Sequence, residues 1–431
     1  MSDFACGAAA ATPFLMRRVV AMEPLLERCA GLDVHQASVV CCVLIGAPGR
    51  RPQQLLRTFG TTRRELEALG AWLAEHGVAQ VGMESTGVYW KPVYAVLEGH
   101  FELIVGNAHH IKNVPGRKTD VKDAEWIAQL VRHGLITKSF VPPPAIRDLR
   151  DLLRHRRTLV ETRTAARNRV LKLLEGANIK LSGVASDVFG VSGMAMLEAL
   201  AAGAASPSEM AGLARGRMRR KRAALEAALE GRVREHQRFL LAMQLRGLEA
   251  IGRDLDALDE RIEAQLEPFR AQHRLLMRIP GVDWVTAAII IAEIGTDMGV
   301  FATARRLAAW AEVAPGNYES AGRPKGAAVR RGNVFLKSAL FAAASAAVRT
   351  KGSYYRDKYH RLRARRGPVR ALMAIAHKLL IAAFHLLATG ELFRDLGESY
   401  LDRITRKRST ARLVQRLSNL GYEVMLVPKA A

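Results

Sequence analysis

Two aspartates lie one helical turn apart in the stretch from Gly116 to His133. Asp120 and Asp123 are three positions apart, and residues at that spacing share one face of a helix. Like charges held this close repel. The pair therefore indicates either a cation between the carboxylates or a helix start that favours negative charge, and both interpretations are open from these residues alone.

The helical interpretation has its own support. Thr119 or Asp120 suits an N-cap, and Ile127, Leu130 and Val131 supply an apolar stripe that can be buried. The segment is therefore predicted to be an amphipathic helix that carries carboxylates near its start.

Two further acids stand at unusual places. Asp33 lies between Leu32 and Val34 in an apolar run, where an uncompensated charge is costly. Glu84 ends another apolar run, and its side chain could meet that of Asp33 if the two runs are neighbouring strands. Carboxylate oxygen is the preferred ligand of Mg²⁺, and converging acids can hold two ions that act on a phosphodiester. The candidate metal ligands and catalytic acids are Asp33, Glu84, Asp120 and Asp123.

The loop from Ala314 to Asn333 is a second place for chemistry. It is rich in glycine and cations and holds one serine, Ser320, as a candidate nucleophile beside phosphate-binding side chains. A serine in such a loop is more often a solvated turn residue, and no histidine is clearly placed as its base. The cations expected to contact nucleic acid are Arg117, Lys118, Arg323, Lys325, Arg330 and Arg331.

The elements that must position the acids begin as a sheet. Residues 30–35 and 38–44 predict an antiparallel hairpin, and residues 54–59 a third strand. Beyond them we expect a helix at 62–76, a strand at 80–84, a helix at 88–98 and a strand at 101–105. Three strands followed by alternating helix and strand predict a mixed α/β sheet with helices on its faces.

After the three prolines at 142–144 the chain becomes helical. Residues 146–174 predict a basic helix and residues 218–273 one long helix. Apolar residues in the latter repeat at steps of three and four: Leu248, Ile251, Leu255, Leu258, Ile262, Leu266 and Phe269. This pattern is typical of a coiled-coil seam, within the chain or between subunits, and equally of a long helix packed on its own domain.

Residues 275–295 predict helix, tight turn and helix. The pattern resembles a helix-hairpin-helix element, whose turn offers backbone N–H groups to a DNA phosphate. Asp283 replaces the usual second glycine of that turn, which puts phosphate binding there in doubt. Further helices are expected at 302–311, 333–348 and 368–388, and a basic helix at 403–416.

Composition narrows the class of partner. The 431 residues allow two or three domains, and 65 Lys and Arg against 41 Asp and Glu give a formal net charge of +24. Such an excess favours nucleic acid first and an anionic membrane second. We expect no membrane span, because the apolar run 371–387 is interrupted by His377, Lys378 and His385.

The cysteines and the N-terminus suggest a cytoplasmic protein. Cys6, Cys29, Cys41 and Cys42 show no C-x-x-C or paired histidine spacing, which argues against a disulfide scaffold and a structural zinc site. The first residues lack the pattern of a secretory signal. We expect residues 1–27 to form a disordered extension, with Met22 as an alternative start.

Five motifs occur together and in order: GLDVH at 31–35, MESTG at 83–87, KTDVKDA at 118–124, IPG at 279–281, and the loop 314–333 around SAG at 320–322. Together they resemble the DEDD transposases of the insertion-sequence "one-ten" family, also called bridge-RNA-guided recombinases. The resemblance covers nearly everything from Cys29 to about Leu396. Departures are Asp283, the extension before Cys29 and the basic tail after Leu401.

The resemblance implies a division into domains. Residues 28–144 would form a RuvC-like domain with the RNase H fold, and residues 145–274 a helical coiled-coil domain. Residues 275–400 would form an all-α C-terminal transposase domain with the helix-hairpin-helix-like element and the serine loop, and 401–431 a basic tail. By the same resemblance Asp33, Glu84, Asp120 and Asp123 bind Mg²⁺, as two ions, and Ser320 is the nucleophile.

The function implied is that of a transposase, a site-specific DNA recombinase that cuts and rejoins DNA through attack by a serine. Its partners would be double-stranded donor and target DNA, a structured guide RNA, and further copies of itself in a dimer or tetramer, associated with the nucleoid and not with a membrane. Two alternatives stay open: a RuvC-like nuclease that hydrolyses branched DNA with metal-activated water, and a non-catalytic nucleic-acid-binding protein.

Overall fold

A computed structural model of the protein describes residues 25–48, 50–85, 87–108, 111, 123–314, 318–320, 323–326 and 332–427. The side chains of residues 318–320, 323–326, 405 and 407–409 are not described. The chain divides into two compact units, Met1–Val141 and Pro142–Ala431. The acids singled out above belong to the first unit, and the serine loop belongs to the second.

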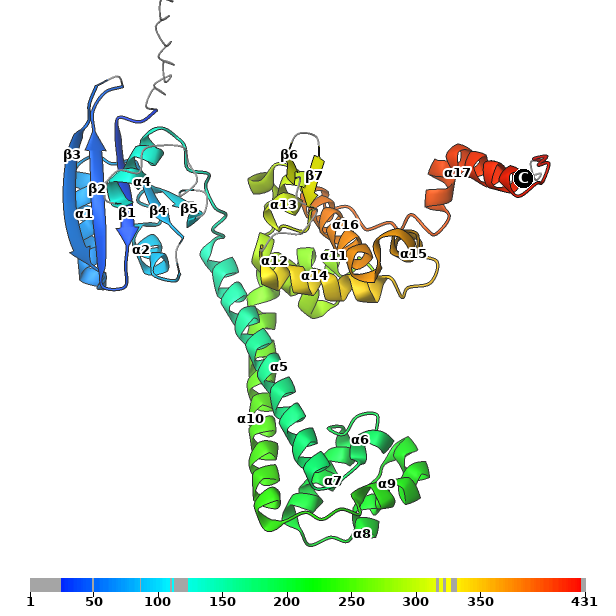
Figure 1. Ribbon diagram of the computed structural model, residues 1–431. Coiled ribbons are helices and arrows are strands. Elements are labelled where there is room, and N and C mark those ends of the chain that lie inside the picture. The colour runs from blue at the N-terminus through cyan, green and yellow to red at the C-terminus, as the bar shows by residue number, and fades with distance from the viewer. Residues whose placement is uncertain are drawn as a thin grey trace, which may run out of the picture. The chain divides into compact units, whose positions relative to one another are not determined.

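A mixed five-stranded sheet forms the centre of the first unit (Figure 1). Its strand order is β3-β2-β1-β4-β5: β1 pairs antiparallel with β2 and β2 with β3, whereas β1 pairs parallel with β4 and β4 with β5. The predicted hairpin-first mixed sheet is confirmed. The strands are β1 (Arg28–Val34), β2 (Ser38–Ile45), β3 (Gln53–Gly60), β4 (Gln80–Glu84) and β5 (Glu102–Gly106).

Helices cover both faces of this sheet. On one face, Leu32 and Met83 are buried in a core with side chains of α1 (Arg63–Glu75) and α2 (Trp90–Leu97). On the other, Cys29 and Cys42 pack against α4 (Asp123–Arg132). Successive residues of β1 alternate between the two cores, as strand geometry requires. The sheet thus lies between two helical layers.

The second unit contains a pair of long helices, α5 (Pro144–Gly176) and α10 (Glu235–Leu266), which run side by side (Figure 1). Leu174 near the end of α5 shares a core with Leu241 near the start of α10. At the other end of the pair, Arg156 Nη2 donates to Asp259 Oδ2 at 3.0 Å, so the helices are antiparallel. The seam of α10 therefore packs on a helix of the same chain. We call this pair the stalk.

Between the two stalk helices the chain forms a small helical cap, which we call the tip. It shares its core with the adjoining ends of the stalk helices through buried residues such as Met196, Leu197 and Leu225. Its elements are α6 (Leu181–Val184), α7 (Val191–Ala202), α8 (Pro207–Gly212), the 3₁₀ helix η1 (Gly216–Lys221) and α9 (Arg222–Leu229).

The prediction of one helix over 218–273 is wrong. The chain leaves helical structure around Gly231, where a Cβ would lie 2.5 Å from the Ala177 carbonyl oxygen, so the backbone passes too close to the end of α5 for another residue type. A second break follows at Pro268, which cannot donate an N–H bond within a helix. The segments after α10 are η2 (Glu267–Phe269) and α11 (Arg270–Leu276).

The described remainder of the second unit consists of helices, connecting segments and a hairpin that the all-α prediction lacked. The strands β6 (Tyr318–Ser320) and β7 (Arg323–Gly326) pair antiparallel. Helices α11, α13, α14 and α15 pack around α16. The helices after α11 are α12 (Trp284–Ile294), η3 (Met298–Phe301), α13 (Ala304–Trp310), α14 (Val334–Ala347), α15 (Tyr354–Arg366), α16 (Pro368–Thr389) and α17 (Tyr400–Asn419).

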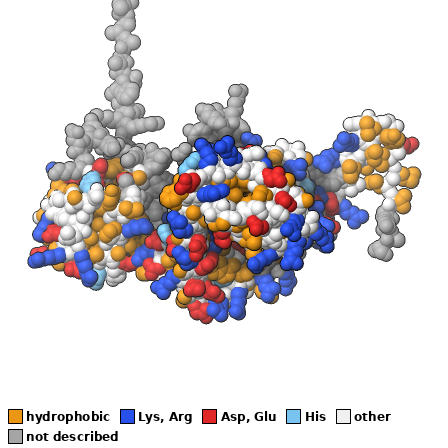
Figure 2. Space-filling view, turned by 90° about the horizontal axis from the view of Figure 1, so that it is seen from below, with side chains coloured by type: hydrophobic (Ala, Val, Ile, Leu, Met, Phe, Trp, Pro, Cys, Tyr) orange, Lys and Arg blue, Asp and Glu red, His pale blue; other side chains and the backbone are white. Residues whose placement is uncertain are grey.

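Helix α16 is long and apolar enough, by length and composition alone, to cross a membrane, which corrects the expectation that no segment is. Its buried residues include Ile375, Leu379 and Leu380. Helices α11, α13, α14 and α15 pack on α16, and 44% of its most apolar window is buried. On the face drawn in Figure 2, Lys and Arg side chains are spread over the described chain with Asp and Glu among them.

Candidate functional site

Two of the four predicted acids end neighbouring parallel strands. The register pairs Leu32 of β1 with Met83 of β4, so Asp33 and Glu84 follow at the same level of the sheet. Glu84 is the last residue of β4, and Asp33 is the last but one of β1. The carboxyl ends of these two strands therefore bring the two acids to one edge of the sheet.

The side chains of these acids point toward the α4 face. Gly31 and Gly82, two residues earlier on each strand, both lie against α4. A Cβ on Gly31 would be 2.2 Å from the Ala128 nitrogen, and one on Gly82 would be 2.3 Å from Val131 Cγ2. Because side chains alternate along a strand, residues two positions later share the same face.

The third acid begins the helix on that face. Asp123 is the first residue of α4, and the next residue, Ala124, has its carbonyl oxygen 2.4 Å from the Cβ position of Gly31. The first turn of α4 therefore lies close to the strand that carries Asp33, and it contains Asp123 and Glu125 where the helix dipole favours them. The predicted buried stripe is confirmed at Ile127, Leu130 and Val131.

The acids that the structure describes do not form a closed metal cluster. Among the residues that the structure describes, no group of three Asp, Glu, His or Cys side chains lies close enough to hold a metal ion. Asp123 is exposed, and Asp33 Oδ2 lies 3.1 Å from His35 Nε2. Asp120 lies outside the described residues, as do Arg117 and Lys118. The structure places three of the four acids.

A buried arginine fixes the far end of α4. Arg132 is 3% exposed, and its Nη2 donates to the carbonyl oxygens of Gly46 at 3.1 Å and Ala47 at 3.2 Å. Its own carbonyl accepts from the Leu25 N–H at 2.9 Å. The described chain is thus bonded to the sheet domain from residue 25, within the segment expected to be a disordered extension. Held at both ends, α4 can keep Asp123 at a set place relative to β1.

The serine loop is described in part. Ser320 ends β6 and pairs with Arg323, the first residue of β7, so the serine lies at the turn of a hairpin. The backbone of Lys325 lies in β7, and Arg330 and Arg331 fall outside the described residues.

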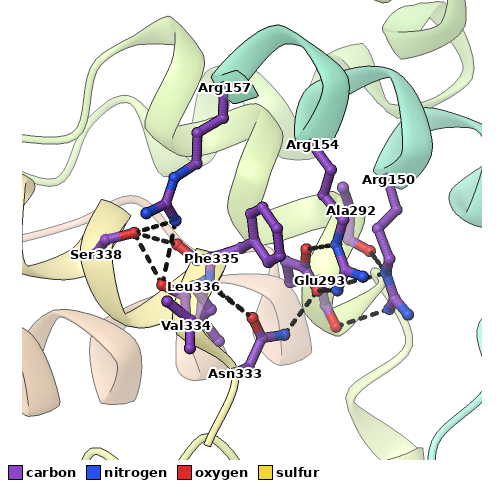
Figure 3. Close-up of polar contacts among 10 residues, drawn as sticks. All are labelled: Arg150, Arg154, Arg157, Ala292, Glu293, Asn333, Val334, Phe335, Leu336 and Ser338. Atoms are coloured by element: carbon purple, nitrogen blue, oxygen red, sulfur yellow. Dashed lines mark hydrogen bonds and ion pairs between the residues drawn. The ribbon is translucent and has the colours of Figure 1, made fainter. Parts of the chain in front are cut away.

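A buried carboxylate holds the point where this loop returns to helix (Figure 3). Glu293 of α12 is 2% exposed, and its two carboxylate oxygens accept from Arg154 Nε at 2.9 Å and Nη2 at 2.8 Å. Arg150 adds an ion pair at 3.4 Å and donates to the Ala292 carbonyl oxygen at 2.9 Å. Burial lowers the pKa of Arg150, and Glu293 beside it raises that pKa in partial compensation.

Asn333, the last residue of the loop, joins this network. Its Nδ2 donates to Glu293 at 2.6 Å, and its Oδ1 caps α14 by accepting from the N–H groups of Phe335 and Leu336 at 3.1 and 3.0 Å. The Phe335 ring lies under the guanidinium of Arg154, 4.5 Å from ring centre to Cζ (Figure 3). Asn333, at the end of the loop, therefore joins α14 to α12, whose Glu293 is paired with α5 at the base of the stalk.

Sequence reasoning missed Glu293 and its two arginines, although a signal was present. Glu293 is the single charge in the apolar helix 284–294, WVTAAIIIAEI, and a lone acid in such a run requires a buried cation. The partners, Arg150 and Arg154, sit on one face of α5 about 140 positions earlier. Because of this separation in the sequence, Arg150 and Arg154 could not be recognised as the partners of Glu293.

A turn joins α11 to α12, as the predicted helix, turn and helix requires, and Asp283 caps the start of α12. Asp283 is the N-cap of α12, and its carboxylate accepts from the Thr286 N–H at 2.8 Å. A carboxylate at that position repels a phosphate. The doubt raised by Asp283 is therefore supported by its geometry.

Comparison with known families identifies the class. Residues 30–179 match the family model of the IS110-type DEDD transposases, described as a transposase, and residues 273–360 match that of the transposase IS116/IS110/IS902 family. No curated protein matches the chain. The chain belongs to the IS110 family of DEDD transposases, enzymes that cleave and rejoin DNA. This assignment favours an enzyme over the non-catalytic alternative.

Proposed function

We propose that the chain is the site-specific recombinase of an insertion sequence, in which four acids hold Mg²⁺ and Ser320 attacks the scissile phosphodiester. The observation that carries this proposal is the position of Asp33 and Glu84 at the carboxyl ends of parallel strands, on the face where α4 begins with Asp123. Ligands of α/β sheets bind at such strand ends. The strand order β3-β2-β1-β4-β5 also supports a RuvC-like domain with the RNase H fold.

The donor chemistry at this edge fits Mg²⁺. Asp33, Glu84 and Asp123 supply hard carboxylate oxygens, and Asp120 would be the fourth ligand of a site for two ions. Bound there, Mg²⁺ would supply polarisation of the phosphodiester and stabilisation of its departing oxygen. The chain supplies Asp33 and Glu84 on two strands and Asp123 on α4. Helix α4 packs closely on Gly31, and Arg132 bonds its far end to the Gly46 carbonyl.

The serine step conserves the energy of the phosphodiester. Ser320 Oγ forms a bond to phosphorus while the bond from phosphorus to one DNA oxygen breaks, and the proton of the serine hydroxyl ends on that oxygen. The product is a serine phosphodiester and a free DNA hydroxyl, which can attack in the reverse sense to rejoin a different strand. Hydrolysis by water would leave a phosphate monoester and lose the energy of the phosphodiester, so that rejoining would need another energy source. Attack by a serine therefore suits a recombinase.

We further propose that base pairing with a structured RNA selects the donor and target DNA while the protein contacts the backbones, a division of labour that suits a net charge of +24. The apolar seam of α10 on α5 supports a coiled-coil domain in the stalk. Assembly into a dimer or tetramer belongs to the same proposal. So do a location at the nucleoid and the absence of a membrane partner.

The proposal is tested by an assay for a covalent protein–DNA adduct that survives denaturant. Labelled DNA carrying the ends of the mobile element, with RNA transcribed from its flank, is incubated with Mg²⁺ and the protein, and a covalent complex is sought by denaturing electrophoresis. We expect the adduct with the wild type and with Ser345→Ala, a matched serine whose hydroxyl is bonded within α14 to the Phe341 carbonyl. Ser320→Ala and Asp33→Asn should give none.

The rival nuclease predicts a different pattern. If water is the nucleophile, Ser320→Ala cleaves at the wild-type rate and no variant forms an adduct, while Asp33→Asn is still inactive. Cleavage by Ser320→Ala at the normal rate would therefore refute the serine mechanism. It would leave the acidic site intact as a proposal, because only the Asp33 variant tests that site.

A further inference from the structure

The tip carries the densest positive charge in the part of the chain between the two family matches. Six of the eight residues 215–222, RGRMRRKR, are Arg or Lys, and all six side chains are exposed. Over residues 177–234 there are nine cations and five acids, a net charge of +4. Residues 180–272 match neither family model, so the family assignment gives this cluster no role.

The backbone of this cluster is held firmly at both ends. The Arg215 N–H donates to Ser192 Oγ at 2.9 Å, and Lys221 Nζ donates to the Val184 carbonyl oxygen at 2.8 Å. Ala214, directly before the cluster, and Leu225, three residues after it, are buried in the tip core. No residue of η1 itself is buried. The segment is thus attached to the tip core at both ends, and its cationic side chains are exposed to solvent.

The cluster is not neutralised by its own protein. Within the described chain none of the six side chains forms an ion pair with a carboxylate, whereas cations of the stalk such as Arg156, Arg157 and Arg253 do. Cations this close in one short helix repel one another. A cluster of cations that lacks carboxylate partners fits a partner that brings regularly spaced negative charge.

We propose that residues 215–222 bind the phosphate backbone of double-stranded DNA. Arginine forms bidentate bonds to phosphate, and five of the six cations are arginines. The segment 211–234 contains no aromatic residue on which unpaired bases could stack, which favours a duplex over a single strand. DNA is the duplex on which this enzyme family acts.

The length of the stalk sets the distance between a DNA contact at the tip and one at the base. Helix α10 has 32 residues, which corresponds to a length of about 48 Å. At one phosphate per 3.4 Å of each strand, this is about 14 base pairs. A contact at the tip therefore holds DNA more than one helical turn away from a contact at the base of the stalk, where the serine loop is anchored.

The proposal is tested by the salt dependence of binding. We would measure the dissociation constant of the full-length protein for a 40-base-pair DNA duplex by fluorescence anisotropy from 50 to 300 mM KCl. For Arg217→Ala/Arg219→Ala/Arg220→Ala we expect binding at 100 mM to weaken at least tenfold. The slope of log K against log salt should fall by up to about 2.7, because each lost phosphate contact removes about 0.9. The lysine triple variant at the same positions should keep most of the slope.

Two comparisons make the result decisive. The triple variant Arg246→Ala/Arg253→Ala/Arg261→Ala removes the same charge from exposed positions of α10, and it should change binding less than threefold. An equal loss in this variant would show that only net charge matters and would overturn the proposal. A loss confined to an RNA duplex of the same length would also overturn it. Binding requires no cleavage, so the result is independent of the Ser320 adduct.

Discussion

Replacing Glu293 by Gln should destabilise the second unit strongly. The substitution keeps the shape of the side chain but removes the charge that Arg154 and Arg150 face, and it places an amide NH₂ against a guanidinium or against Asn333. Removing one partner of a buried ion pair costs about 3–5 kcal/mol, because the other charge is left uncompensated. Arg154 is 35% exposed and keeps part of its hydration, so we expect the lower end, about 3 kcal/mol.

The assay must report on the second unit alone. Urea unfolding of the full-length protein, followed by hydrogen exchange of peptides from α12 and α14, meets this need. The matched control is Arg253→Ala, which breaks an ion pair with Glu249 whose side chains are 70% and 66% exposed, and it should cost less than about 0.5 kcal/mol. A cost of 1 kcal/mol or less for Glu293→Gln would refute the view that this network holds α5, α12 and the end of the serine loop together.

Two further predictions concern the sheet domain. Gly31→Ala should destabilise it by about 1–3 kcal/mol, since the new Cβ would overlap the backbone of α4. The control is Gly247→Ala on α10, where a Cβ meets open space, and it should stabilise the stalk slightly. Thermal unfolding measures both variants, and equal melting temperatures would contradict the close approach of Gly31 to α4. Burial raises the pKa of the Cys29 and Cys42 thiols to about 12, so neither should react with a thiol reagent at pH 8 until the protein unfolds. Because these thiols ionise near pH 9 when unfolded, stability should fall as pH rises from about 9 toward 12. Rapid labelling of Cys29 or Cys42 in the native protein, located by peptide mass spectrometry, would show the burial to be wrong.

The sheet could be predicted from the sequence because its signals are local. Alternating and apolar runs bounded by turn residues identify all five strands, and the carboxylates of Asp33 and Glu84 draw attention as charges in apolar strands. That both acids point toward α4 could not be read, since it depends on the register between β1 and β4 and on two glycines whose partners lie about 50 to 100 residues later.

In the helical unit, local sequence signals predicted the structure less well. Periodicity identified α5 and the apolar seam of α10, but the predicted helix runs through Gly231 and its apolar repeat runs past Pro268, and the observed helix breaks at both places. In these two cases residue type overrides pattern, because of a close backbone approach at the glycine and a missing donor at the proline. The Glu293 network escaped because it joins residues from three separate stretches of the chain.

The antiparallel course of the stalk makes the segment between the two family matches a detour. The chain leaves along α5, passes through the tip and returns along α10, and the two helices meet again near the base, where Arg156 of α5 donates to Asp259 of α10. A longer or different tip would leave the base ends of α5 and α10 in place, as a surface loop can vary on an unchanged scaffold. The tip is therefore the part of this transposase that can diverge between related elements without disturbing the machinery at the base.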